Sequence, residues 1–274
     1  MGHRNSDLAG HALTHKAKRT VIMSSVKDYL FELEQERCVE WIKNTFGIDI
    51  DPDEPSEEWD SLASEFRAMH DAESEEAEAR WLERHSYNEF FFEFSEELTT
   101  ASSLLALKGD SAQASTLYKL VYAQAVTLLE TLISSVVRKL VVSDQKLMMR
   151  LAAQHEHLHK RTITLKEIAE QPKAVEAIVL KVLSELSFHN VATIKEVLGA
   201  MFGDHMKGLE VGGIARICAK RHDIVHRNGK TVNDAPIVLA PDEVEQAITT
   251  IGAFGADLKV RIYSALDDLN STAL

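Results

Sequence analysis

Turn-forming residues are scarce in this sequence, which has only 12 Gly and 5 Pro among its 274 residues. Because Gly and Pro build the tight turns between strands, their scarcity favours long helices over a turn-rich sheet. Cysteine is scarcer still. Cys38 and Cys218 lie far apart without metal-ligand spacing, so no cysteine metal site is predicted, and two thiols are compatible with a reducing cytoplasm.

Long uninterrupted apolar runs are also missing. Residues 1–20 contain none, which argues against a signal peptide. Charged residues interrupt every long apolar stretch further on, so no membrane span is expected. Hydrophobic residues nevertheless make up 45% of the chain, enough for a packed core. We therefore expect a cytoplasmic protein that does not bind membranes.

Negative charge is concentrated in the first hundred residues. The formal net charge of the chain is -13, and residues 1–100 contain 10 basic and 24 acidic residues, whereas residues 101–274 contain 20 and 19. This asymmetry indicates two units with different partners. The acidic part is either a solvated helical surface or a module that shields a cationic groove or docks on a basic partner.

The spacing of apolar residues predicts an all-α fold. Helices are expected over residues 25–46, 56–69, 73–98, 111–140, 144–159, 174–186, 193–201, 211–227 and 241–269, and one more begins at the capping-box pair Thr164 and Glu167. Asp110 or Ser111 is expected to cap the central core helix. We divide the chain into a mobile tail (1–20), an acidic helical region (21–100) and a helical domain (101–274).

The segment that concentrates chemistry is residues 221–229, which read Arg-His-Asp-Ile-Val-His-Arg-Asn-Gly at the predicted end of a helix. Asn228-Gly229 is a good helix stop, because Gly tolerates the left-handed conformation. Histidine is suited to proton transfer near neutral pH, and arginine can grip phosphate. Together they could cleave RNA without a metal: the ribose 2′-hydroxyl attacks the adjacent phosphate, His moves protons and Arg stabilises the charged transition state.

Arg221 and His226 are five residues apart, which separates them by about 140° around an ideal helix. A site that uses both side chains therefore needs a distorted helix end or a second copy across a two-fold axis. An isologous homodimer would bring two such pairs together in one cleft.

The same segment has simpler interpretations, which the residues alone leave open. Cations at a helix C-terminus are favoured by the helix dipole. Asp223 and Arg227, four residues apart, could form a surface ion pair. His222 and His226 are also four apart and could chelate a metal ion.

Residues 221–226, with Arg221 first, His222 in the polar second position and His226 last, resemble the signature of the HEPN superfamily. The context adds to the resemblance. A corner at residues 188–190, an amphipathic helix, the motif and a final long helix resemble a bacterial subgroup of that superfamily. The long helix with Glu130 resembles the first HEPN helix, which often carries an acidic residue facing the motif. The resemblance covers about residues 100–270 and leaves the first hundred unassigned.

The resemblance implies a four- or five-helix bundle that forms a homodimer with the motif at the interface. It implies a metal-independent endoribonuclease without cofactors, of toxin–antitoxin, anti-phage or abortive-infection systems. Arg221 and His226 would be catalytic, His222 would orient them, and Glu130 would support the site. We also expect Asp223 to support the site, apart from the resemblance. Independently of the resemblance, we expect four residues to contact the RNA backbone: Lys220, Arg227, Asn228 and Lys230. The expected partners are an RNA substrate, a second copy and an antitoxin or defence-system protein.

Some HEPN proteins lack nuclease activity. The alternative function is therefore a non-catalytic dimerisation and interaction module whose acidic N-terminal region docks on a partner. A third possibility combines the two: the acidic region occupies the cleft in cis until a trigger releases it.

Two further clusters have functional and structural interpretations. His155 and His159 would share a helix face and could bind Zn²⁺, but a solvated helix end is the preferred interpretation of the run that also includes His157. Tyr118, Lys119 and Tyr122 could line an RNA groove, although half-buried core is preferred for the tyrosines.

Overall fold

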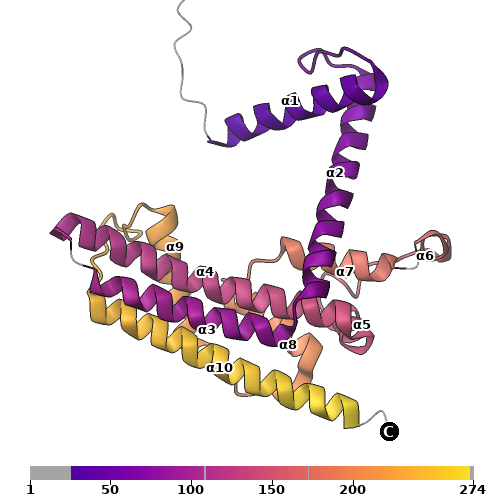
Figure 1. Ribbon diagram of the computed structural model, residues 1–274. Coiled ribbons are helices and arrows are strands. Elements are labelled where there is room, and N and C mark those ends of the chain that lie inside the picture. The colour runs from indigo at the N-terminus through magenta and orange to yellow at the C-terminus, as the bar shows by residue number, and fades with distance from the viewer. Residues whose placement is uncertain (1–25, 108, 172, 272–274) are drawn as a thin grey trace, which may run out of the picture. The chain divides into compact units, whose positions relative to one another are not determined.

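The computed structural model describes residues 26–107, 109–171 and 173–271, and these form helices joined by turns (Figure 1). The α-helices are α1 (Val26–Phe46), α2 (Glu57–Arg84), α3 (Tyr87–Ser103), α4 (Ser111–Ser143), α5 (Gln145–Gln154), α6 (Leu165–Glu170), α7 (Ala174–Glu185), α8 (Val191–Phe202), α9 (Gly212–His226) and α10 (Pro241–Ser271). Two 3-10 turns follow α3 and α8: η1 (Leu104–Ala106) and η2 (Gly203–Met206). No strand occurs within the described ranges, so the all-α prediction is confirmed. The tail expected over residues 1–20 lies outside them.

The chain divides into two compact units, residues 1–77 and 78–274. The division between these units lies inside α2, whereas residue 100, where charge had led us to divide the chain, lies inside α3. The buried aromatic residues of α3 share one core with α4 and α10: Phe90, Phe91 and Phe94. Burial against α4 therefore assigns α3 to the larger unit, although its exposed face continues the acidic composition of the first hundred residues.

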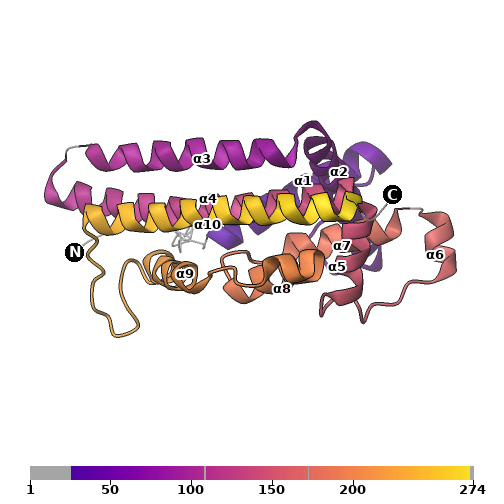
Figure 2. The same ribbon diagram turned by 90° about the horizontal axis from the view of Figure 1, so that it is seen from below.

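Helices α3, α4 and α10 form the body of the larger unit. Figure 2 shows α3 in one layer, α4 and α10 in the next, and α8 and α9 beyond them. Contacts join α4 to α3, α9 and α10, so α4 is the central helix, as its apolar composition predicts. α3 and α10 approach closely at Gly255, where a Cβ atom would lie 2.5 Å from Cε1 of Phe94.

The central helix α4 has the length and composition of a membrane-spanning helix, with a most apolar 18-residue window of mean hydropathy 1.6. Glu130 is the only charged residue between Leu120 and Val137, so charge interrupts this stretch less than the sequence argument assumed. In the structure, 56% of that window is buried inside the protein, as in the core helix of a bundle.

Local capping explains where several helices begin. Asp110 caps α4, and the predicted capping box of Thr164 and Glu167 opens α6. Pro241 occupies the first position of α10, as expected. The helix expected over residues 73–98 is instead two helices, because Ser86 and Glu89 form a capping box that starts α3. This box is a local signal in the sequence that marks the break.

Candidate functional site

The motif occupies the last two turns of α9 and the turn that follows. α9 ends at His226, and the backbone then turns through Asn228 and Gly229, whose φ angles are 52° and 73°. The Gly229 N–H donates to the carbonyl oxygen of Ile224 at 3.0 Å, which closes the turn. The predicted helix stop is confirmed, since glycine adopts this left-handed conformation without strain.

Lys119 of α4 covers this turn. A Cβ atom at position 229 would lie 2.9 Å from Nζ of Lys119 and 3.2 Å from its Cε. Because these atoms are the end of a flexible side chain that can move aside, the glycine is needed here mainly for its backbone angle. The contact brings a cation from the central helix to the end of the motif.

Arg221 lies partly inside the bundle. Its Nε is buried and has no hydrogen-bond partner among the described residues. The pKa of the neighbouring Cys218 thiol is raised to about 11, mainly by burial and further by Glu130, whereas Arg221 lowers it. Both charges thus act on the same buried thiol. A buried donor without a partner costs about 1–3 kcal/mol, so Arg221 favours any acceptor that can reach it.

His222 and His226 lie together on the exposed side of α9. Their ring centroids are 4.7 Å apart, and the ring planes are inclined by 41°. Both side chains are exposed. In the described ranges no group of three or more His, Cys, Asp or Glu residues could hold a metal ion, so the two imidazoles have no third ligand beside them.

Arg221 and His226 have different surroundings. Arg221 is half-buried and His226 is exposed, in agreement with their angular separation on the helix. No hydrogen bond or ion pair between them is present in the described part of the chain. The structure of one chain therefore brings the two histidines together but does not join either of them to Arg221.

Two of the cations around the motif are paired with carboxylates. Arg227 forms the predicted ion pair with Asp223 one turn earlier, and Lys220 pairs with Glu243 of α10. The remaining residues predicted to contact RNA are exposed on the turn: Asn228 and Lys230. Lys220 and Arg227 thus have partners within the chain, and these carboxylates weaken the attraction of both cations for a phosphate.

Glu130 of α4 pairs with His189, a residue that sequence analysis placed only in a corner between helices. The distance from Nδ1 of His189 to Oε1 of Glu130 is 3.1 Å. Ser187 lies against the same ring, with its Oγ 2.8 Å from Nδ1. His189 and Glu130 are 59 residues apart in sequence, so no local pattern could have revealed the pair.

A polar hollow of about 450 Å³ opens beside Glu130 between α4 and the end of α2. Its other lining residues are Glu78, Trp81, Thr131, Ser134, Ser135 and Arg138. Arg138 pairs with Glu78 at 3.0 Å. Both acids of the hollow therefore have partners, whereas Nε of Arg138 is buried without a hydrogen-bond partner among the described residues.

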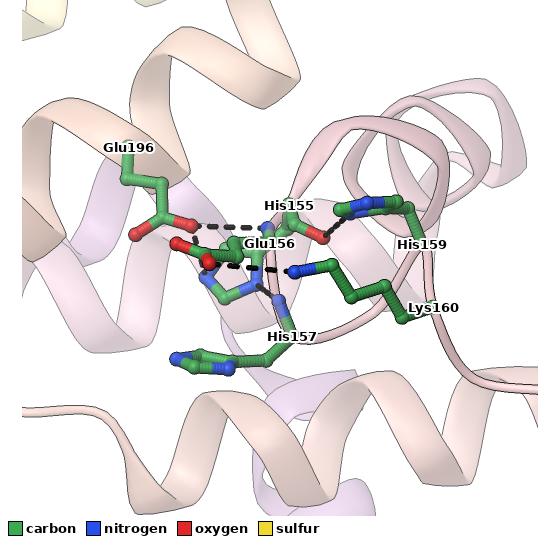
Figure 3. A network of polar contacts seen from close by, with 6 residues as sticks. All are labelled: His155, Glu156, His157, His159, Lys160 and Glu196. Carbon is green, nitrogen blue, oxygen red and sulfur yellow. Dashed lines mark hydrogen bonds and ion pairs between the residues drawn. The ribbon is translucent and has the colours of Figure 1, made fainter.

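The cluster around His155 is structural (Figure 3). We expected a solvated helix end, but His155 is 0% exposed, and α5 ends before it, at Gln154. The Nδ1 of His155 accepts a hydrogen bond from the His157 N–H at 3.3 Å, and Nε2 lies 3.6 Å from Oε1 of Glu196. Burial lowers the pKa of His155 below its usual value, and Glu196 opposes this. Nε2 has no hydrogen-bond partner among the described residues, and the polar link from the end of α5 to α8 is the Glu156 N–H, which donates to Oε1 of Glu196 at 3.0 Å.

The tyrosines of α4 belong to the core. Tyr122 is buried, and burial raises the pKa of its hydroxyl, with Glu243 adding to the effect. Tyr118 is partly buried against the same cluster. Of the three residues considered for an RNA groove, Lys119 is therefore the one that reaches the motif.

No family model matches this chain, and comparisons with curated proteins and with solved structures give no match either.

Proposed function

We propose that this protein is a metal-independent endoribonuclease of the HEPN type that uses Arg221 and His226. The observation that carries the proposal is that one helix end holds two complementary groups: a guanidinium whose buried donor has no partner among the described residues, and an imidazole open to solvent. The first favours an anionic oxygen, and the second can exchange protons near neutral pH. These are the two functions that metal-free cleavage of RNA needs.

In the proposed reaction, His226 takes the proton of a ribose 2′-hydroxyl, and the 2′ oxygen attacks the adjacent phosphorus. Arg221 stabilises the negative charge that grows on the non-bridging oxygens. The bond to the 5′ oxygen then breaks, and an imidazolium returns a proton to that oxygen. The products are a 2′,3′-cyclic phosphate and a 5′-hydroxyl. His222, whose ring lies 4.7 Å from that of His226, orients the imidazole.

The same proposal includes a homodimer with the motif at its interface. Arg221 and His226 face different surroundings in one chain, so a second copy across a two-fold axis supplies the missing member of each pair. Exposed apolar side chains on α9, on the turn after it and on α4 next to Lys119 are suited to such a contact: Val225, Val232, Val238 and Leu120. Apolar residues at the centre of an interface are those that drive association.

We further propose that the enzyme is a cytoplasmic toxin or anti-phage effector controlled by an antitoxin or another defence-system protein. This part rests on the resemblance of residues 221–226 to the HEPN signature. Expression of the intact protein should then slow cell growth, and expression of His226→Ala should not.

The biochemical test is cleavage of total RNA and tRNA by the purified protein. Arg221→Ala and His226→Ala should each reduce the rate by about 100-fold or more, because proton transfer and charge stabilisation each contribute about that much. His157→Ala, which removes another exposed imidazole, is the control and should cleave normally. EDTA should have no effect.

Strong inhibition by EDTA would instead indicate a metal ion on His222 and His226. Absence of cleavage by the folded, unmodified protein would favour the non-catalytic interaction module.

A further inference from the structure

The described part of the smaller unit is a helical hairpin with a small core. Its buried residues, among those that the structure describes, are Cys38 and Ile42 on α1 and Ala63 and Phe66 on α2. They gather near the loop that joins the helices, where the Trp41 ring lies 5.6 Å from that of Phe66. From this loop the two helices diverge (Figure 1). The contact between them is therefore confined to one end.

The open end of the hairpin exposes large apolar side chains. Tyr29, Leu30 and Phe31 on the first turns of α1 are 59%, 56% and 61% exposed. On α2, residues 71–77 are all exposed. Within the described part of this unit, α2 therefore leaves the apolar start of α1 largely uncovered.

A groove between the helices continues from the small core toward this open end. Two hollows of about 170 Å³ and 240 Å³ share Glu34, Phe66 and Arg67. Phe31 lines the first hollow and Leu30 the second. The exposed apolar residues thus lie along a preformed groove and are not scattered over the surface.

Two helices with so little mutual contact bury too little apolar surface to be well packed by themselves. A third helix in the groove would cover Leu30 and Phe31 and extend the core. Contiguous apolar surface of this kind marks interaction sites, and helix-in-groove binding is a common solution.

Charge indicates what the third helix carries. Residues 26–77 contain 17 acidic and 4 basic residues. A second copy of this hairpin would bring two strongly negative surfaces together, which repel each other. A helix with basic residues beside its apolar face would instead be attracted, and its correct orientation would be favoured.

We propose that the α1–α2 hairpin is a docking site for a basic amphipathic helix of a partner protein. The apolar face of that helix lies in the groove beside Leu30 and Phe31, and its Lys and Arg residues face the acids of the hairpin. This proposal does not depend on the ribonuclease proposal, because it uses none of the residues of the motif.

The test uses the full-length protein and a fluorescent helical peptide with leucine on one face and lysine on the other. Binding is followed by fluorescence anisotropy. Phe31→Ser should weaken it by about tenfold, the cost of losing one large buried side chain. Phe92→Ser on α3 is the matched control, because Phe92 is 66% exposed in the other unit and should leave binding unchanged. Leu30→Ser provides a second variant.

Two control peptides and a salt titration separate the contribution of the apolar face from that of the charge. A peptide of the same composition whose leucines do not share a face, and a peptide with glutamate in place of lysine, should both bind at least about tenfold more weakly. Increasing salt should weaken binding of the original peptide, because exposed charges are screened.

The proposal is wrong if the amphipathic basic peptide does not bind, or if it binds Phe31→Ser and Phe92→Ser equally. It is also wrong if Phe31→Ser converts a dimer to a monomer in sedimentation, since the occupant is then a second copy. The peptide could also bind only after Lys16, Lys18 and Arg19 are replaced by serine. In that case the groove belongs to the chain's own N-terminal residues, and the proposal is equally wrong.

Discussion

Gly255 of α10 is the position where the packing of the larger unit can be tested by adding one methyl group. A Cβ atom there would lie 2.5 Å from Cε1 of Phe94, 3.2 Å from Cζ and 3.3 Å from Cδ1. The Phe94 ring is buried between α3, α4 and α10 and cannot move into solvent. Gly255→Ala therefore forces α3 and α10 apart or moves the ring from its preferred position.

The magnitude follows from two opposing effects. Replacing a glycine by alanine inside a helix contributes about 1 kcal/mol to stability, whereas overpacking a core costs about 1–3 kcal/mol. Gly255→Ala should thus lower the free energy of unfolding by about 1 kcal/mol. Gly252→Ala, one turn earlier on α10, is the matched control, because its Cβ would lie 3.8 Å from the nearest atom, Cδ1 of Leu98. It should raise the free energy of unfolding by about 1 kcal/mol.

The assay is urea unfolding followed by circular dichroism. The two variants should differ by about 2 kcal/mol, and Phe94→Leu in the Gly255→Ala background should recover part of the loss by making room. If Gly255→Ala is as stable as Gly252→Ala, the close approach of α3 and α10 at this position is refuted.

Three further predictions concern single residues. The pKa of His155 is lowered in the folded protein. Its contribution to stability is therefore present above about pH 6.5 and is lost as the pH falls further, because the unfolded chain then binds the proton more readily. In urea titrations at several pH values, His155→Gln should weaken this acid dependence, and an unchanged dependence would contradict the burial of a neutral imidazole. Ser86→Ala removes the cap of α3 and should cost about 1 kcal/mol in the same unfolding assay; no loss would show that the cap contributes nothing. Gly229→Ala should cost about 1–2 kcal/mol for its left-handed backbone, and about as much as Gly208→Ala, whose φ of 77° is also positive and where nothing lies within 4 Å, because the flexible Lys119 side chain can move aside; a clearly larger cost at position 229 would show that Lys119 is held in place.

The helical elements could be predicted from sequence where a local signal marks their ends. Asp110, the Thr164–Glu167 box and the Asn228-Gly229 stop each act within a few residues, so the chain itself carries the information. The missed break at Ser86 has the same kind of signal. The break was missed because the helical spacing of apolar residues continues across Ser86, which predicted one helix in spite of the capping box.

Features that depend on distant segments could not be predicted in this way. His155 is buried beside Glu196 of α8, and the partner of Glu130 is His189 in another corner of the fold. The assignment of α3 to the larger unit depends on its packing against α4 and α10, whereas composition divided the chain by charge. In the candidate site, spacing correctly predicted the ion pair of Asp223 and Arg227, but not that Lys220 would pair with Glu243.

The central claim is that Arg221 and His226 form one RNA-cleaving site that two copies of the chain complete. The most direct measurement is RNA cleavage by Arg221→Ala, by His226→Ala and by an equimolar mixture of the two after subunit exchange. Each variant alone should be inactive. The mixture should recover about a quarter of the normal rate, because half of the dimers then combine an intact Arg221 with an intact His226 in one of two sites. Full activity of either variant alone, or an inactive mixture in which heterodimers have formed, would contradict the account.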